Sequence, residues 1–218
     1  MAEAVLRSKA PLWPSAGLWP KAVLWDVGNV IVRWSPRALY SKIFPDDDAC
    51  DRFLSTVCTL EWHVGHDLGV TFADNRAPLL ARFPHHAAEI EAWETRWWEM
   101  FPGAISETEA AIEDLAARGV AQFGLSNMSH EVRDGVLALS PAFARLDGLV
   151  ISGELGVVKP DAAIYHAACE RFGRAPQDFL FVDDSAANIA AAHALGFDTH
   201  HFTDPAALRP ALEARGLL

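Results

Sequence analysis

The chain has 218 residues, of which 51% are hydrophobic and 22% are charged, and its formal net charge is −11. This length is enough for one sizeable core, with or without a small inserted domain. The acidic charge argues against a generic grip on the phosphate backbone of nucleic acid. The three cysteines show no CxxC spacing. We therefore expect a globular protein with free thiols in a reducing cytoplasm and with no nucleic-acid partner.

Residues 1–21 carry two tryptophans, Trp13 and Trp19, among prolines and basic residues. These prolines and basic residues interrupt every apolar run, so the segment lacks the pattern of a secretory signal. No apolar run in the chain approaches the roughly 20 residues of a membrane-spanning helix. We interpret residues 1–21 as an N-terminal arm that is extended or partly disordered, and we expect no membrane partner.

The chemistry of the chain is predicted to centre on Asp26. The run Ala22–Asp26 is continuously apolar up to its final acid, which is typical of a parallel strand covered on both faces. Asp26 would then lie at the carboxyl end of that strand, where open α/β sheets bind ligands. Gly28 follows, and a glycine permits an unusual backbone turn close to a ligand. The alternative interpretation of Asp26 is a simple turn or helix-cap aspartate.

Residues 36–103 are predicted to be almost wholly helical. Ser35 followed by Pro36 is typical of a helix N-cap with proline at the first helical position. The expected helices cover residues 37–43, 45–58, 71–83 and 86–100. A polar break over residues 61–69 separates the second helix from the third. Three large apolar residues, Trp93, Trp97 and Met100, fall on one face of the last helix, and we interpret them as core packing.

From residue 105 onward, strands are predicted to alternate with helices. The expected strands cover residues 120–125, 148–152, 179–183 and 197–202. A capping box of Ser106 and Glu109 is expected to open the first helix of this part. Such alternation predicts a parallel sheet with helices on both faces. The expected fold is therefore an α/β, Rossmann-like core formed by residues 22–35 and 104–218, with a small all-helical domain inserted over residues 36–103.

Polar residues lie at or near the ends of predicted strands, or just before a predicted helix, in three further segments of this core: Ser126-Asn127, Lys159, and Asp183-Asp184. In this order, together with Asp26, they resemble the four motifs of the haloacid dehalogenase-like (HAD) hydrolase superfamily. The resemblance covers residues 22 to about 205. The amino-acid sequence of the first motif is most similar to that of the branch that includes bacterial sugar-phosphate phosphatases of the glucose-1-phosphate type. The resemblance implies that residues 36–103 form a type 1 cap, which is a lid domain over the active site.

The resemblance also implies phosphoryl transfer, in which the protein mainly positions the phosphoryl group and neutralises its charge. Asp26 would be the nucleophile and would form an aspartyl-phosphate. Ser126 and Asn127 would donate hydrogen bonds to the phosphoryl oxygens, although Ser-Asn is also common in simple turns. Lys159 would lie as a point charge against the phosphoryl group and the nucleophile.

Magnesium is the implied cofactor, because two anions must approach each other and Mg²⁺ prefers oxygen ligands. The implied ligands are Asp26, the backbone carbonyl of Gly28, and the adjacent acids Asp183 and Asp184. The second acid aligns with the usual ligand of the family, so Asp184 is favoured over Asp183. Helix capping is the alternative explanation for one acid, but two adjacent acids repel each other without a cation.

Gly28 departs from the pattern of the family, which usually places a second aspartate at this position as general acid and base. That step is typically worth about 10²–10⁴-fold in rate. A leaving group of low pKa, such as an anomeric oxygen, needs less help. Alternatively, a polar residue of the helical insertion substitutes for the aspartate: Glu61, His63, His66 or Asp67. The third interpretation is a HAD-fold binding or regulatory protein with weak turnover.

The predicted function is a magnesium-dependent phosphatase acting on a small phosphorylated metabolite, with a sugar phosphate favoured. Asn127, Trp62 and His63 are the predicted substrate contacts; Trp62 can stack on a sugar ring, and core packing is its equal alternative. The main rival is a 2-haloacid dehalogenase, which also uses an aspartate nucleophile but attacks carbon without a metal. Adjacent acids at the end of the fourth strand have no use in that metal-free reaction.

Overall fold

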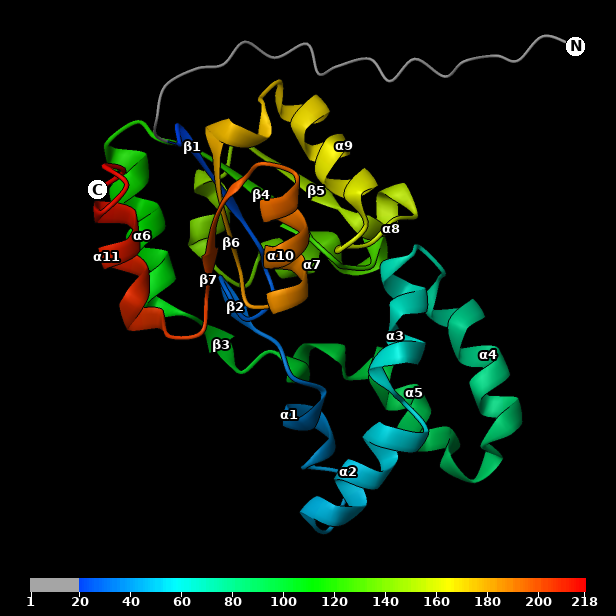
Figure 1. The fold of residues 1–218 in the computed structure, drawn as a ribbon. Helices are drawn as coiled ribbons and strands as arrows, with labels where there is room; N and C mark the ends of the chain where they lie inside the picture. The colour runs from blue at the N-terminus through cyan, green and yellow to red at the C-terminus, as the bar shows by residue number, and fades with distance from the viewer. Residues whose placement is uncertain (1–19) are drawn as a thin grey trace, which may run out of the picture.

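The computed structural model describes residues 20–218, so the predicted arm of residues 1–21 lies outside this range except for its last two residues. Its centre is a five-stranded sheet in the order β5-β4-β1-β6-β7, in which every neighbouring pair is parallel. The strands are β1 (Ala22–Trp25), β4 (Ala121–Ser126), β5 (Gly148–Ile151), β6 (Phe179–Asp183) and β7 (Asp198–His201). The predicted α/β, Rossmann-like fold is confirmed, and Figure 1 shows helices around the sheet. Within residues 20–218, no helix is long and apolar enough to cross a membrane.

Alternate residues of β1 pack into two different hydrophobic cores, one on each face of the sheet, which is why this strand is apolar throughout. Val23 and Trp25 belong to the core that includes Ile112 and Leu212 on one face of the sheet. Ala22 and Leu24 belong to the core on the other face. The first core involves α6 (Ser106–Ala117) and α11 (Leu208–Glu213), and the second involves α9 (Ala162–Phe172) and α10 (Ala186–Ala194).

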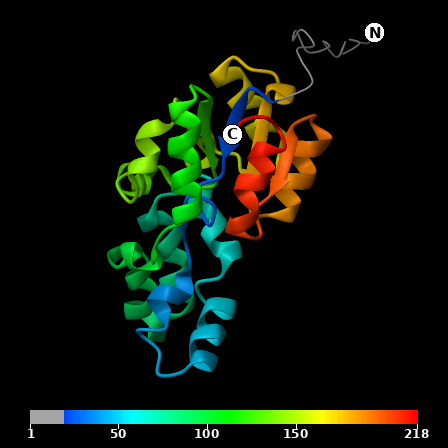
Figure 2. The same ribbon diagram turned by 90° about the vertical axis from the view of Figure 1, so that its left-hand side faces the viewer.

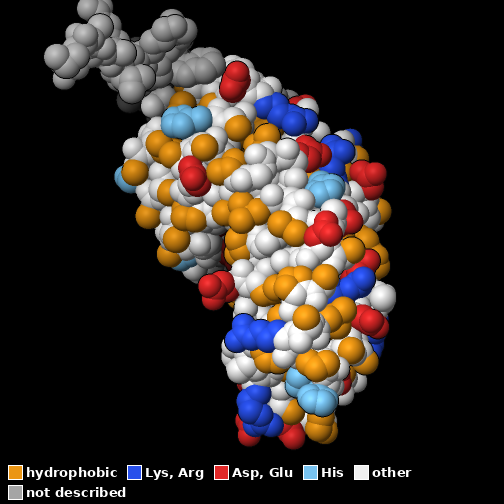
Figure 3. Space-filling view, turned by 90° about the vertical axis from the view of Figure 1, so that its right-hand side faces the viewer, with side chains coloured by type: hydrophobic (Ala, Val, Ile, Leu, Met, Phe, Trp, Pro, Cys, Tyr) orange, Lys and Arg blue, Asp and Glu red, His pale blue; other side chains and the backbone are white. Residues whose placement is uncertain are grey.

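Residues 36–103 form a helical lobe that lies beyond one end of the sheet (Figures 1 and 2). Its helices are α1 (Pro36–Tyr40), α2 (Asp47–Thr56), α3 (Leu60–Asp67), α4 (Phe72–Arg82) and α5 (Ala87–Thr95), with 3-10 turns at Pro84–His86 and Trp97–Met100. The chain enters and leaves the lobe through two short strands, β2 (Val32–Arg33) and β3 (Gly103–Ala104), which pair with each other in an antiparallel arrangement. Lys/Arg and Asp/Glu side chains are interspersed over the face in Figure 3.

The predicted polar break over residues 61–69 is wrong, because most of it is helix α3. The Thr59 hydroxyl caps this helix by accepting a hydrogen bond from the Trp62 backbone N–H. Two histidines and an aspartate, His63, His66 and Asp67, are its buried residues. The hydrophobic pattern of an ordinary amphipathic helix is therefore inverted here, and a search for apolar periodicity misses it.

Smaller departures concern the ends of helices. The predicted capping box is wrong, since the Ser106 hydroxyl bonds to the next residue and Glu109 accepts from Ser140 Oγ at 2.5 Å. The predicted helix over residues 86–100 is interrupted at Arg96. After β4, the chain forms a 3-10 turn (His130–Val132) followed by α7 (Arg133–Leu137). A one-turn helix, α8 (Ser152–Leu155), was not predicted. The remaining 3-10 turns are Pro141–Arg145, Pro176–Asp178 and Pro205–Ala207.

Candidate active site

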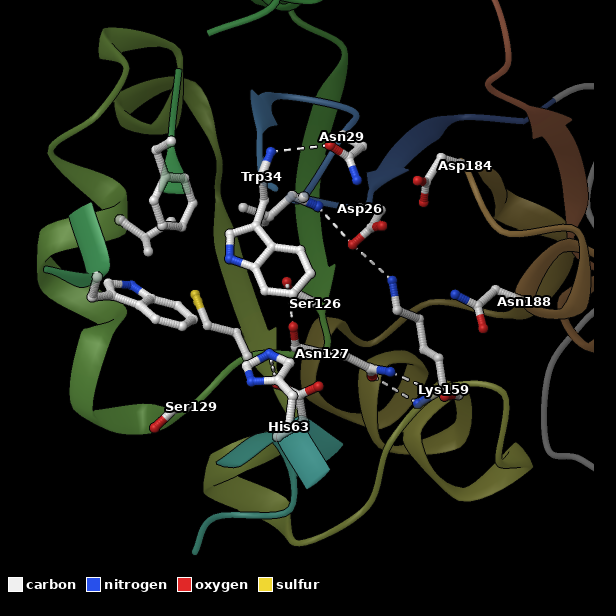
Figure 4. A pocket seen from close by; sticks show the side chains of 17 residues that line it. Asp26, Asn29, Trp34, His63, Ser126, Asn127, Ser129, Lys159, Asp184 and Asn188 are labelled. Carbon is white, nitrogen blue, oxygen red and sulfur yellow. Dashed lines mark hydrogen bonds and ion pairs between the residues drawn. The ribbon is translucent and has the colours of Figure 1, made fainter. Parts of the chain in front are cut away.

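The parallel register brings the predicted motifs to one edge of the sheet. Trp25 pairs with Val182 of β6 and with Gly124 of β4, so the residues that follow on all three strands meet beyond the same edge. The Asp26 N–H extends the ladder by donating to the Val182 carbonyl at 2.9 Å. A cavity of about 210 Å³ opens there between the sheet and the helical lobe (Figure 4).

Lys159 is the buried cation of this cavity. Its Nζ lies 2.8 Å from Asp26 Oδ1 and 2.7 Å from Asp183 Oδ2, and it donates to the Leu125 carbonyl at 2.9 Å. Burial lowers the pKa of Lys159, but the two carboxylates raise it by more, so the net shift is upward. The ammonium group is therefore charged and fixed beside Asp26, as its predicted role requires.

The two carboxylate oxygens of Asp26 differ in their contacts, because the hydrogen bond and the ion pair both involve Oδ1. Its Oδ1 accepts from the Val27 N–H at 2.7 Å and pairs with Lys159, while the side chain lines the cavity. Burial raises the pKa of Asp26, and Lys159 works against that shift. Additional positive charge in the cavity would therefore favour the ionised, nucleophilic form.

The adjacent acids Asp183 and Asp184 have different surroundings. Asp183 is fully buried and does not line the cavity. Its oxygens accept from Lys159, from the Ser185 N–H at 2.8 Å and from Asn188 Nδ2 at 3.0 and 3.1 Å. Asp184 instead lines the cavity, and burial and then Asp183 raise the pKa of its carboxyl. The structure thus places Asp183 as an anchor for Lys159 and leaves Asp184 facing the open space.

Three carboxylates, those of Asp26, Asp183 and Asp184, offer oxygens within 4.8 Å of one another, and they form an Asp cluster that can hold a metal ion. Such hard oxygen donors suit Mg²⁺. Because Asp183 is committed to hydrogen bonds, Asp26 and Asp184 are the members with oxygen available to an ion, and Gly28 lies on the same wall. The residues present therefore fit the cofactor expected from the sequence.

Ser126 and Asn127 reach the cavity, but they are not equivalent. The Ser126 hydroxyl is buried, and it donates a long hydrogen bond of 3.4 Å to the Asn127 carbonyl. The side chain of Asn127 donates to the Lys159 carbonyl at 3.0 Å and accepts from the Lys159 N–H at 2.8 Å. Ser126 is thus free to donate to a ligand, whereas the Asn127 amide mainly holds the loop that carries Lys159.

The conformational reason given for Gly28 is wrong. Its φ is not in the left-handed region, and a Cβ at this position would meet nothing within 4 Å. The next residue, Asn29, has φ 57°, and asparagine tolerates this region better than most residues. The Asn29 side chain accepts from the Trp34 N–H at 3.0 Å, which closes the turn on the cavity wall (Figure 4).

The helical lobe and its connections supply the wall that faces the sheet. His63 lines the cavity, stacked on Trp34 with ring centroids 5.0 Å apart, and burial followed by His66 lowers its pKa to about 3. Trp62 does not line it: its indole N–H donates to the Asn75 carbonyl at 2.9 Å. The core-packing alternative for Trp62 therefore fits the structure better, because its ring packs inside the lobe.

Several lining residues were not predicted as site residues. Trp97 was interpreted as core packing, yet it also faces the cavity. The other such residues on the wall are Trp34, Phe101, Met128, Val136 and Ser129. No sequence pattern separates such residues from ordinary core residues, because apolar walls and apolar cores have the same composition. Asn188, near the start of α10, also lies on the wall.

A buried lysine thus lies between two carboxylates at the carboxyl ends of parallel strands, where open α/β sheets bind their ligands. Residues 20–196 match the haloacid dehalogenase-like hydrolase family, and the chain belongs to it. A HAD family enzyme of Bacteroides thetaiotaomicron, in complex with magnesium and inorganic phosphate, superposes with TM-score 0.65 at 20% identity, covering 87% of this chain and 98% of that one. A dehalogenase crystal structure superposes with TM-score 0.66 at 18% identity, covering 88% and 97%.

Curated relatives match over shorter segments. The (S)-2-haloacid dehalogenase 1 of a Pseudomonas species is 32% identical over 99 residues, or 45% of this chain and 42% of that enzyme. A sesquiterpene phosphatase of Aspergillus oryzae is 28% identical over 111 residues, or 49% of this chain and 54% of that enzyme. The chain thus spans about half the length of the curated relatives it matches.

Proposed function

We propose that this HAD-like hydrolase is a magnesium-dependent phosphatase that cleaves a small phosphate monoester. The observation that carries the proposal is the placement of Asp184, a second carboxylate that faces the cavity beside Asp26 and Lys159. A metal-free displacement at carbon has no use for that second charge, whereas an approaching phosphate dianion requires a cation between the acids. The magnesium and phosphate bound to the Bacteroides enzyme support the same assignment.

In the proposed reaction, the free oxygen of Asp26 attacks phosphorus and an aspartyl-phosphate forms. Lys159 stays 2.8 Å from the nucleophile and balances the charge of the transferred group. Ser126 donates a hydrogen bond to a phosphoryl oxygen. Asp26, Asp184 and the Gly28 carbonyl would hold Mg²⁺, which supplies further positive charge against the phosphoryl oxygens when bound. Water then releases phosphate from Asp26.

The second candidate is a 2-haloacid dehalogenase, favoured by the 32% identity to such an enzyme over 99 residues. The two reactions share the aspartate nucleophile and the lysine, so these residues do not discriminate between them. They differ in metal dependence and product. Phosphate release that stops with EDTA supports the phosphatase, and halide release from 2-chloropropionate that persists with EDTA supports the dehalogenase.

Replacing Asp184 by asparagine is expected to remove most of the stabilisation that Mg²⁺ gives the wild type. A ligand at a hundredfold excess over its Kd stabilises the folded state by about 2.7 kcal/mol, and Asp184, directly after β6, is a proposed ligand of the ion. The measurement is the melting temperature with and without MgCl₂. Asp134→Asn, which removes an acid whose side chain is 95% exposed, is the matched control and should keep the full shift. An unchanged shift in Asp184→Asn would contradict the metal assignment.

We propose an apolar alcohol, rather than a sugar, as the leaving group. One part of the wall is apolar and is formed by Val27, Trp34, Trp97, Phe101, Met128 and Val136, although as many uncharged polar side chains also line the cavity. Figure 4 places Asp184, Lys159 and Asn188 on one side of the cavity and Trp34, His63 and Ser129 on the other. Sugar hydroxyls buried against such a wall would lose hydrogen bonds to water, so an apolar alcohol fits better. The sesquiterpene phosphatase among the relatives points the same way.

Phenyl and short prenyl phosphates are expected to exceed glucose 1-phosphate in kcat/KM by about tenfold or more, since each buried apolar group contributes on that scale. The measurement is phosphate release across a panel of monoesters, with magnesium and with EDTA. Trp97→Ala should lower kcat/KM for the apolar esters more than for glucose 1-phosphate. A preference for the sugar ester in the wild type would reject the apolar substrate while leaving the phosphatase assignment in place.

A further inference from the structure

We propose that Asp67, on helix α3 of the helical lobe, is the general acid and base that replaces the aspartate missing at position 28. This inference rests on the proposed phosphatase function. The two reacting groups would then come from different parts of the chain: the nucleophile from the edge of the sheet and the proton donor from the helical lobe.

The position of Asp67 is that of a group facing a ligand. The residue is 7% exposed and lines the same cavity as Asp26 and Lys159. Within residues 20–218, its buried Oδ1 has no hydrogen-bond partner. This oxygen lies 3.6 Å from His63 Nε2, which is too long for a hydrogen bond. Leaving it buried without a partner is costly for an ionised carboxylate, so the surroundings favour a protonated carboxyl on the cavity wall.

The charges around Asp67 suit a proton carrier. Burial raises the pKa of its carboxyl to about 7, and Lys159 opposes this shift. His63 is neutral because burial and His66 lower its pKa, so it does not hold Asp67 as a carboxylate. A carboxyl with such surroundings can both give and accept a proton near neutral pH.

The other polar residues of α3 fit the role less well. Glu61 is exposed to solvent, on the outside of the lobe. His66 is fully buried and does not line the cavity. His63 lines it, but its low pKa leaves it without a proton to donate near neutral pH.

The proposed proton transfers balance over the two half-reactions. In the first, the Asp26 oxygen bonds to phosphorus, the ester P–O bond breaks, and the Asp67 proton passes to the leaving alkoxide. In the second, the Asp67 carboxylate takes a proton from water as that water attacks phosphorus. The P–O bond to Asp26 then breaks, and phosphate leaves with Asp26 and Asp67 restored to their starting forms.

Asp67→Asn is expected to lower kcat/KM for phenyl phosphate by about 10²–10⁴-fold, the range of general acid catalysis. It should lower kcat/KM for 2,4-dinitrophenyl phosphate far less, because that leaving group departs without a proton. The parameter kcat/KM reports the first half-reaction, so the comparison does not depend on release of phosphate from Asp26. The control is Glu61→Gln, the same chemical change on the exposed face of α3. An equal loss for both esters would overturn the proposal, since a purely structural role affects both alike.

A rescue variant keeps the test independent of folding. A Cβ at Gly28 meets nothing within 4 Å, so Gly28→Asp has room for the carboxyl that the family usually carries there. In the Asp67→Asn background, Gly28→Asp should restore at least about tenfold of the lost activity on phenyl phosphate. If Gly28→Asp gave no rescue and the loss were equal on both esters, the role of Asp67 as general acid and base would be rejected, and the phosphatase assignment would stand. Absence of phosphate release by the wild type on every ester would reject the phosphatase assignment itself.

Discussion

Asp26→Asn is expected to lower phosphate release by about 10⁴-fold or more, the scale on which loss of a nucleophile acts. An amide does not attack phosphorus, and the neighbouring groups do not replace it, because Asp183 is enclosed by hydrogen bonds. The measurement is single-turnover and steady-state phosphate release with magnesium, on an apolar ester. Acid-quenched wild type should carry covalent phosphate on Asp26, and the variant should carry none.

The fold of Asp26→Asn should survive, which separates chemistry from stability. The amide oxygen can still accept from the Val27 N–H, and Lys159 keeps its contact with Asp183. The melting temperature should therefore stay close to that of the wild type, because removing a carboxyl whose pKa burial raises also removes a desolvation cost. Phosphate release within tenfold of the wild type, in a folded variant, would remove Asp26 from its proposed role.

The positions of the candidate site residues could be predicted from the sequence because parallel strands end at one edge of a sheet. Asp26, Ser126 and the Asp183-Asp184 pair each follow an apolar run, and the register of β1 with its two neighbours brings them together. The fold class followed from the same alternation of strands and helices. The resemblance favoured Asp184 over Asp183 as a metal ligand, but the sequence did not predict the contact of Asp183 with Lys159. Burial and hydrogen bonds turn Asp183 toward Lys159, whereas Asp184 lines the cavity.

The lobe was harder to predict because helix α3 reverses the usual hydrophobic pattern. Helix α3 buries His63, His66 and Asp67, so the polar side of the helix is the one that faces inward. A rule that assigns polar stretches to loops and tryptophans to substrate contact therefore fails at this helix. Trp62 packs inside the lobe, while Asp67 reaches the cavity. Such local conflicts between pattern and structure are expected at functional sites.

Lys159→Met is expected to destabilise the folded state by about 3–5 kcal/mol, which is the scale for leaving buried charges without a partner. The methionine keeps the length and apolar character of the lysine stem but removes the cation between Asp26 and Asp183. The loss should grow with pH. Burial already raises the pKa of Asp26, and loss of Lys159 raises it further above the unfolded value. Between those two values the folded state binds more protons than the unfolded state, so the free energy of unfolding falls as the pH rises.

Chemical denaturation at pH 5 and pH 8 measures this effect, and the double variant Lys159→Met/Asp183→Asn identifies its cause. Removing the Asp183 charge should restore much of the stability lost at pH 8 without restoring phosphate release, because Lys159 has both a structural and a catalytic role in the proposed site. Added Mg²⁺ should stabilise the single variant by acting on Asp26 and Asp184. A loss that is equal at both pH values would instead indicate that lost packing, rather than unpaired carboxylate charge, explains the effect, because packing does not depend on protonation. The balance of charge in this site would then rest on the metal alone, and the lysine would be needed only for the chemical step.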